Sequence, residues 1–302
     1  MKNFFESPMP SYTFEIFPPK GTASTAGTYA VIDNLVCFNP DLISVTYGAG
    51  GSSRDNTVEI TSGIQNKYKV CGVAHLTCVG TTRKELKQIL DELRANNVRN
   101  ILALRGDLKD KSDLGEFHHA SELIKFIKDE YGDEFDIFAA CYPEKHPEAK
   151  SLDEDLKYLK EKCDLGVKAL ISQLFFDNDV FRQWREKARS IGITQPVIAG
   201  IMPITSAVQI SKVVEMCGAS VPVRVRRFAD AYGFNQAAIR EAGIAYAAEQ
   251  IIDLIAGDVE GIHLYTMNQP DVVRRIDMAI RSVLYTKRYG LGIRNEGLGI
   301  RD

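Results

Sequence analysis

The sequence has no run of 18 or more apolar residues, so it predicts no membrane-spanning helix. Its first ten residues include Lys2, Glu6 and two prolines and lack the apolar core of a signal peptide, which favours a cytoplasmic location. Neither charge dominates, since 37 Lys and Arg stand against 40 Asp and Glu. The resulting pI of about 6.0 argues against a broad nucleic-acid-binding surface.

Cysteine and histidine are scarce, and apart from the adjacent His118 and His119 they are scattered along the sequence. The six cysteines contain no Cys-x-x-Cys pair, which favours reduced thiols over disulfides or a zinc site. His75 stands alone in an apolar segment, and no His-Glu-x-x-His spacing occurs, so we predict no metal centre. No Gly-x-Gly-x-x-Gly follows the first expected strand, which weakens a dinucleotide-binding sheet as the architecture.

Strand-like apolar runs alternate with amphipathic segments along the chain. We expect eight strands at Tyr12–Phe17, Leu42–Tyr47, Val70–Thr77, Asn100–Leu104, Asp136–Cys141, Ala169–Phe175, Val197–Ile201 and Gly261–Thr266. Helical spacing occurs at Lys84–Arg94, Ala120–Glu130, Leu152–Lys162, Val180–Ser190, Val208–Met216 and Ala237–Ile255. A single (β/α)8 TIM barrel is the simplest architecture for this alternation, with an open doubly wound sheet as the alternative.

We expect one domain over residues 1–285. Residues 286–302 contain the sequence Gly-Leu-Gly-Ile-Arg twice and are predicted to form a flexible tail.

Polar residues gather where the expected strands end, the edge at which barrels carry their active sites. Arg105-Gly106-Asp107 follows the apolar run Ile101–Leu104 directly. Glu15 lies inside the apolar segment Thr13–Phe17, where it is either a proton donor at the barrel mouth or the partner of a buried cation.

Further candidates follow the other strands. The glycine-rich segment Tyr47–Arg54 either brings backbone amides close to a ligand or is a flexible loop. Two prolines stiffen the segment that carries Tyr142 and His146, which suits contact with a flat cofactor; the alternative is an ordinary proline-rich turn. Gln173 in an apolar strand needs polar partners, which a ligand can provide. The last strand brings Tyr265 and Asn268.

Five motifs, in the same order, resemble methylenetetrahydrofolate reductase: Phe14–Lys20, Ser44–Ala49, His75–Cys78, Leu104–Asp107 and Tyr142–Ala149. The resemblance runs from about Tyr12 to about Asn268. It implies a (β/α)8 barrel that binds FAD and reduces 5,10-methylenetetrahydrofolate to 5-methyltetrahydrofolate. The electrons would come from NADH, NADPH or a redox partner subunit, and a homo-oligomer is expected.

The resemblance also implies roles for individual residues. Glu15 matches the general acid, and Asp107 matches the aspartate near flavin and folate, so both are expected to be catalytic and to contact substrate. The positions expected to contact FAD are Thr46, Tyr47, Ala49, His75, Arg105, Gly106, Asp107, His119, Ala120, Tyr142, His146, Ala149, Asp155 and Lys162. Gln173 matches a glutamine that serves folate and nicotinamide. Phe181 and Gln269 stand at substrate-contacting positions where a tyrosine and an arginine are familiar.

Two other classes of function remain open at this point. A flavin-free, folate-binding methyltransferase can use the same kind of barrel. A non-catalytic subunit of a larger redox complex is the other alternative, and the presence of both Glu15 and Asp107 argues against it.

Overall fold

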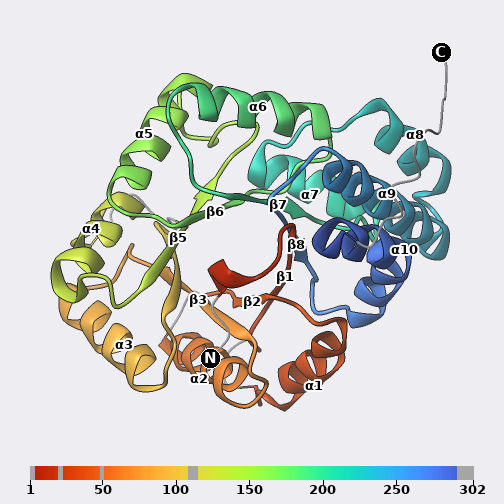
Figure 1. Cartoon of the computed structure of the whole chain (residues 1–302). Coiled ribbons are helices and arrows are strands. Elements are labelled where there is room, and N and C mark those ends of the chain that lie inside the picture. Colours follow the sequence, from red (N-terminus) through yellow and green to blue (C-terminus); the bar gives the residue numbers. More distant parts are fainter. Residues whose placement is uncertain (1–3, 20–22, 48–50, 108–114, 291–302) are drawn as a thin grey trace.

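Eight parallel strands close into a barrel in the computed structural model, which describes residues 4–19, 23–47, 51–107 and 115–290, with only the backbone for residues 51–55. Figure 1 shows helices surrounding this barrel. The strands are β1 (Ser11–Ile16), β2 (Leu42–Val45), β3 (Cys71–Thr77), β4 (Asn100–Leu104), β5 (Asp136–Cys141), β6 (Ala169–Ser172), β7 (Val197–Ile201) and β8 (Gly261–Tyr265). Pairing of β1 with both β2 and β8 closes the sheet, so the predicted (β/α)8 barrel is confirmed.

The amphipathic segments form helices as expected: α3 (Arg83–Ala95), α4 (Ala120–Tyr131), α5 (Leu152–Asp164), α6 (Asn178–Ser190), α7 (Ala207–Cys217) and α9 (Gln236–Ala256). In α3 the spacing buries Leu86, Leu90 and Leu93, and a capping box formed by Thr82 and Glu85 fixes where the helix begins. Local hydrogen bonding and burial of one face therefore specify the same helix.

Four helices lie outside the expected set: α1 (Ala26–Leu35), α2 (Gly51–Asn66), α8 (Val223–Tyr232) and α10 (Pro270–Tyr289). Residues 51–54, expected to belong to a loop, form the first turn of α2. Residues 286–289, expected to belong to the tail, continue α10, whereas residues 291–302 lie outside the described part. None of the described helices is both long and apolar enough to cross a membrane.

Alternate residues of each strand face the barrel interior, since side chains on a strand alternate between its two faces. Tyr12 and Phe14 of β1 pack outward in the core between sheet and helices. The interior at the amino-terminal end is apolar and contains Leu42, Val73, Leu102, Phe138 and Ile198. A short 3₁₀ helix, η1 (Phe4–Glu6), closes this end with the Phe4 ring, whose centroid is 5.5 Å from that of Phe138.

A buried ion pair joins the last helix to the base of the barrel. Arg288 of α10 pairs with Asp41 and also donates from Nε to the Pro10 carbonyl at 2.7 Å. Asp41 Oδ2 accepts a further hydrogen bond from the Tyr12 amide at 2.8 Å. These contacts hold the start of β1 against the end of α10 and leave the opposite, carboxyl-terminal end of the barrel free to form a site.

Candidate active site

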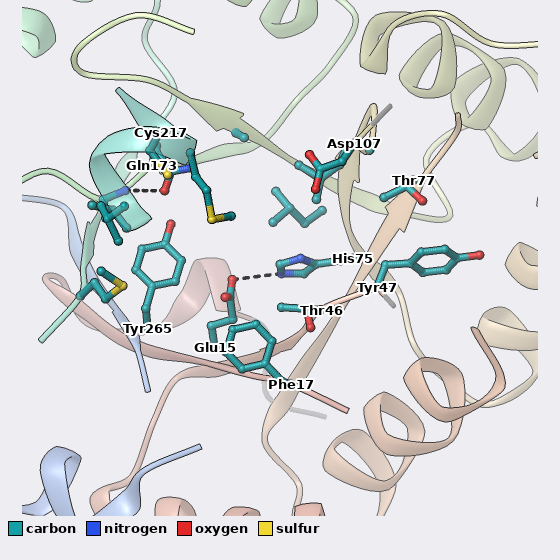
Figure 2. Close-up of a pocket in the computed structure, with 18 of the residues that line it drawn as sticks. Glu15, Phe17, Thr46, Tyr47, His75, Thr77, Asp107, Gln173, Cys217 and Tyr265 are labelled. Atoms are coloured by element: carbon teal, nitrogen blue, oxygen red, sulfur yellow. Dashed lines mark hydrogen bonds and ion pairs between the residues drawn. The ribbon is translucent and has the colours of Figure 1, made fainter. Parts of the chain in front are cut away.

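A cavity of about 1170 Å³ opens at the carboxyl-terminal ends of the strands (Figure 2). Its wall includes Glu15 of β1, His75 and Thr77 of β3, Leu104 of β4 and Tyr265 of β8. Pockets for a single small ligand usually measure about 300–1,000 Å³. The volume is therefore sufficient for more than one ligand of moderate size.

Glu15 is only 8% exposed and faces two buried histidines. Its Oε2 lies 3.6 Å from Nε2 of His75 and 3.8 Å from Nε2 of His263. Figure 2 shows the Glu15 carboxyl group pointing toward the His75 ring. The backbone is fixed as well, because the Thr266 hydroxyl donates to the Glu15 carbonyl at 2.6 Å.

His75 is held in its neutral form. Burial lowers the pKa of His75 to about 4, an effect that nearby Glu15 opposes and His263 reinforces. Its Nε2 has no hydrogen-bond partner among the described residues. This buried nitrogen faces the Glu15 carboxyl group, so the two side chains form one polar unit at the cavity wall.

His263 of β8 was missed by the sequence analysis. The alternation that points Tyr265 into the barrel also applies to His263, two residues earlier, so the signal was present. The Thr13 hydroxyl donates to the Ile262 carbonyl at 3.1 Å and lies 2.7 Å from Nδ1 of His263. The other ring nitrogen, Nε2, lies 3.4 Å from the Ser44 hydroxyl, so hydroxyl groups on both sides hold the ring in place beside Glu15.

Arg105, Gly106 and Asp107 form the rim at the end of β4. Arg105 makes two hydrogen bonds to Glu148, at 2.5 and 2.8 Å, and its charge lowers the pKa of that carboxyl group. Gly106 has φ +95°, and a Cβ added there would lie 3.0 Å from Cβ of Thr77. Asp107 lines the cavity on the other side of the opening from Glu15 in Figure 2.

The segment after β5 presents two rings to the same cavity. Tyr142 and His146 meet edge to face with centroids 4.7 Å apart. Burial raises the pKa of Tyr142 to about 12 and lowers the pKa of His146, so both rings are neutral near pH 7. Behind them, Asp155 accepts from the His146 amide at 3.1 Å, and Lys162 donates to the Ala140 carbonyl at 2.9 Å. The first contact holds the segment after β5, and the second holds β5 itself.

The third part of the wall comes from β6, β8 and the segment that follows β8. Tyr265 donates to the Ser172 carbonyl at 2.7 Å. Gly200 leaves room for this contact, because an added Cβ would lie 2.2 Å from the Ser172 oxygen and 2.8 Å from the Tyr265 ring. Gln173 accepts from the Leu174 amide through Oε1 at 2.8 Å. Asn268 makes two 2.9 Å hydrogen bonds to the backbone of Phe17, which also lines the cavity.

Most of the expected site residues line this one cavity: Glu15, Thr46, Tyr47, His75, Arg105, Gly106, Asp107, Tyr142, His146, Gln173 and Gln269. Other expected cofactor contacts do not contribute to its wall: His119, Ala120, Ala149, Asp155 and Lys162. Ala49 lies outside the described residues.

Phe181, expected to contact substrate, lies instead in the core. Its ring is fully buried and stacks on Phe175 at a centroid distance of 4.8 Å, because α6 turns its apolar face toward the barrel.

Helix α7 forms a wall of the cavity that is not evident from the sequence. This helix and the residues before it contribute Thr205, Ser206, Val208, Gln209, Lys212, Val213, Met216 and Cys217. The strand ends of the sequence do not predict these residues, because they lie on a helix and in the segment before it.

Comparison with known proteins gives a consistent result. A family model described as methylenetetrahydrofolate reductase matches residues 1–281. The 5,10-methylenetetrahydrofolate reductase of Escherichia coli (strain K12) is 35% identical over 260 residues, which cover 86% of this chain and 87% of that protein. Methylenetetrahydrofolate reductase (NADH) 1 of Arabidopsis thaliana is 34% identical over 282 residues, covering 89% of this chain but 48% of the plant protein. The chain thus spans about half the length of that plant relative.

A solved structure with low sequence similarity shares the fold. It is an uncharacterized protein from Clostridium thermocellum, described as binding two copies of 5-methyl-5,6,7,8-tetrahydrofolic acid. The TM-score is 0.64 at 13% identity, over 93% of this chain and 98% of that one. At this identity the likeness concerns the barrel alone.

Proposed function

Since this chain belongs to the methylenetetrahydrofolate reductase family, we propose that it catalyses the flavin-dependent reduction of 5,10-methylenetetrahydrofolate to 5-methyltetrahydrofolate. The observation that carries the proposal is the position of Glu15, a buried carboxyl group between two histidines on the wall of a large cavity. NADH or NADPH is the proposed electron donor.

The cavity wall fits FAD. Leu104 and Ala140 give apolar surface, and Tyr142 and His146 give neutral rings. The backbone at Gly106 is free of a side chain at a point where a Cβ would press on Thr77. Thr46, Tyr47 and Arg105 complete the set of residues that would hold the cofactor. When bound, FAD would supply the hydride acceptor and donor that side chains lack.

Glu15 is suited to hold and deliver a proton. A carboxyl group must carry a proton to act as an acid, and Glu15 lies buried on the cavity wall with ring nitrogens of His75 and His263 as its polar neighbours. His75 is neutral near pH 7 because burial lowers its pKa to about 4, so it adds no positive charge to this part of the cavity wall. The proton of Glu15 would pass to the bridging ring of the folate as that ring opens. General acid assistance of this kind is worth about 10²–10⁴-fold in rate.

The other polar groups orient the substrate. The Oε1 atom of Gln173 is already occupied by the Leu174 amide, so its side-chain NH₂ is the group left to donate to a ligand. Asp107 is exposed at the rim and offers a carboxylate to the N–H groups of a pterin ring. Gln269 also lines the cavity and can bind polar groups farther along the folate.

Substitution of Glu15 by glutamine, followed through the two half-reactions separately, tests this function. Mixed anaerobically with NADH, the flavin of the variant should bleach within about twofold of the wild-type rate, since no proton from Glu15 is needed there. Transfer from the reduced flavin to 5,10-methylenetetrahydrofolate should slow by at least about 10²-fold. Glu130→Gln, at an exposed residue of α4 paired with Lys87, is the matched control and should leave both steps unchanged.

Equal loss of both half-reactions in Glu15→Gln would contradict the role assigned to Glu15. A wild-type protein that binds folate yet takes up no FAD would instead point to a flavin-free, folate-binding barrel. If a reduced partner protein bleaches the flavin and neither NADH nor NADPH does so, the electron donor is that partner protein rather than a nicotinamide cofactor.

A further inference from the structure

The charged groups on the cavity wall are mostly negative or already paired. Glu15, Glu85 and Asp107 line it as carboxyl-bearing side chains, and Arg105 and Lys212 are the lysine and arginine side chains that line it within the described residues. The guanidinium of Arg105 is committed to Glu148 through two hydrogen bonds. His75 and His146 have lowered pKa values and contribute little positive charge near pH 7.

Lys212 is the exception. It lies on α7, is exposed at the cavity, and forms no ion pair or side-chain hydrogen bond with any of the described residues. A lysine ammonium with no anionic partner at a ligand site is a point charge available to an anion. Gln209 and Met216 on the same wall lie three residues before and four residues after it, so the three side chains share one face of α7.

The rest of this wall suits the middle of a folate. Leu174, Met202 and Val213 line it and are each 7% exposed, which gives an apolar surface for a benzoyl ring. The reacting ring of the substrate must lie near Glu15, deep at the strand ends. The glutamate end of the same molecule, with its carboxylates, then has to extend toward the opening and away from Glu15 and Asp107.

We infer that Lys212 is a specificity-determining residue that binds a carboxylate of the substrate's glutamate tail. The inference rests on the proposed function and deepens it by naming the group that recognises the anionic end of the folate. Gln269, which also lines the cavity, is neutral and can donate a hydrogen bond without supplying charge. The pairing would be largely exposed, so it should be of modest strength and weaken as salt is added.

Two substrates distinguish this role from a general effect on the site: 5,10-methylenetetrahydrofolate and its counterpart that lacks the glutamate. For Lys212→Ala, KM for the glutamate-bearing substrate should rise about three- to tenfold, with kcat at saturation and flavin reduction by NADH unchanged. KM for the glutamate-free substrate should match that of the wild type. Lys212→Glu should raise KM further and Lys212→Arg should restore most of the loss, since the two variants reverse and retain the charge.

Two control variants separate charge and helix effects. Ser211→Ala changes an exposed neighbour on α7 that does not line the cavity. Lys287→Ala removes a lysine from α10, where its partner is Asp258 just before β8, at the amino-terminal end of the barrel. Neither control should alter KM for either substrate.

Equilibrium binding of 5-methyltetrahydrofolate and its glutamate-free form, by titration calorimetry, keeps the test independent of turnover. If the wild type binds both but reduces nothing, the proposed function fails while the role of Lys212 is still measured. The inference is overturned if Lys212→Ala weakens both ligands equally or neither. It is also overturned if the variant raises only KM for NADH, which would assign the ammonium to the phosphates of the nicotinamide donor.

Discussion

Replacing His75 with glutamine should make the protein markedly less sensitive to mild acid. The folded state holds His75 neutral, since burial lowers its pKa from 6.5 to about 4. In the unfolded chain the same ring takes up a proton near pH 6.5. Between these two values the unfolded state therefore binds more protons than the folded state, and stability falls as the pH drops from about 6.5 toward 4.

The size of the effect follows from the two pKa values. Linkage between pH 7 and pH 5 gives a loss of about 2 kcal/mol from His75 alone, because the folded ring is still almost wholly neutral at pH 5. At 6% exposure His75 is shielded from solvent, and Glu15 and His263 are the charged or titratable groups that act on it. Glutamine is of similar size but does not titrate, so His75→Gln removes this contribution while all others remain.

Urea unfolding at pH 7 and pH 5, at the same flavin content, measures the difference. The wild type should lose about 2 kcal/mol more than His75→Gln over this interval. His118→Gln replaces an exposed histidine outside the cavity wall and should behave like the wild type. Identical pH dependence of the wild type and His75→Gln would refute the reasoning, since it would mean that folding does not suppress protonation of His75.

Two backbone predictions concern the rim. Gly106→Ala should lower the free energy of unfolding by about 1–3 kcal/mol and reduce flavin content, because φ +95° is unfavourable for alanine and the new Cβ meets Thr77. Chemical denaturation measures the first effect and the flavin-to-protein absorbance ratio measures the second. An unchanged absorbance ratio would contradict the prediction. Asn268→Gly introduces a residue that adopts φ +54° without strain, so the backbone should be preserved. The substitution removes both side-chain hydrogen bonds to the Phe17 backbone, each of which contributes about 0.5–1.5 kcal/mol to stability. It should raise KM for the folate with little change in flavin reduction, and the opposite pattern would place Phe17 on the cofactor side.

The strands were largely predictable because their patterns are nearly continuous. Expected and observed bounds agree for β4, β5 and β7, whereas β6 ends at Ser172 rather than Phe175. The apolar pattern continues through Leu174 and Phe175, but the pairing of β6 with β7 consists of Leu170 with Val197 and Ile171 with Ile198. The apolar residues thus continue beyond the last residue that is hydrogen-bonded to the neighbouring strand, and the periodicity of the sequence alone cannot show where strand pairing stops.

The missed helices have two different causes. In α10, Val272, Ile276, Ile280 and Leu284 recur at helical spacing after Pro270, so the signal was present and unused. In α8 the buried residue is Val225, and most of the helix is exposed, so its sequence has no apolar stripe that would predict a helix. The site shows the same contrast, since strand ends identified Glu15 and Asp107, whereas Lys212 reaches the cavity only through the packing of α7.

The barrel interior changes from apolar at one end to polar at the other, which explains how a stable fold can contain a buried polar atom without a hydrogen-bond partner. Residues two apart on a strand occupy successive layers of the interior, so Val73 belongs to the apolar layer and His75 to the polar one. Burying His75 with an unpaired Nε2 is unfavourable, and the layer formed by Leu42, Leu102 and Phe138 offsets that cost by burying apolar surface against η1. The two layers meet at Leu102 and Ile171, which belong to the apolar cluster and also line the cavity. Successive inward-facing residues of the same eight strands thus provide the stabilising apolar cluster at one end of the barrel and the reactive groups at the other.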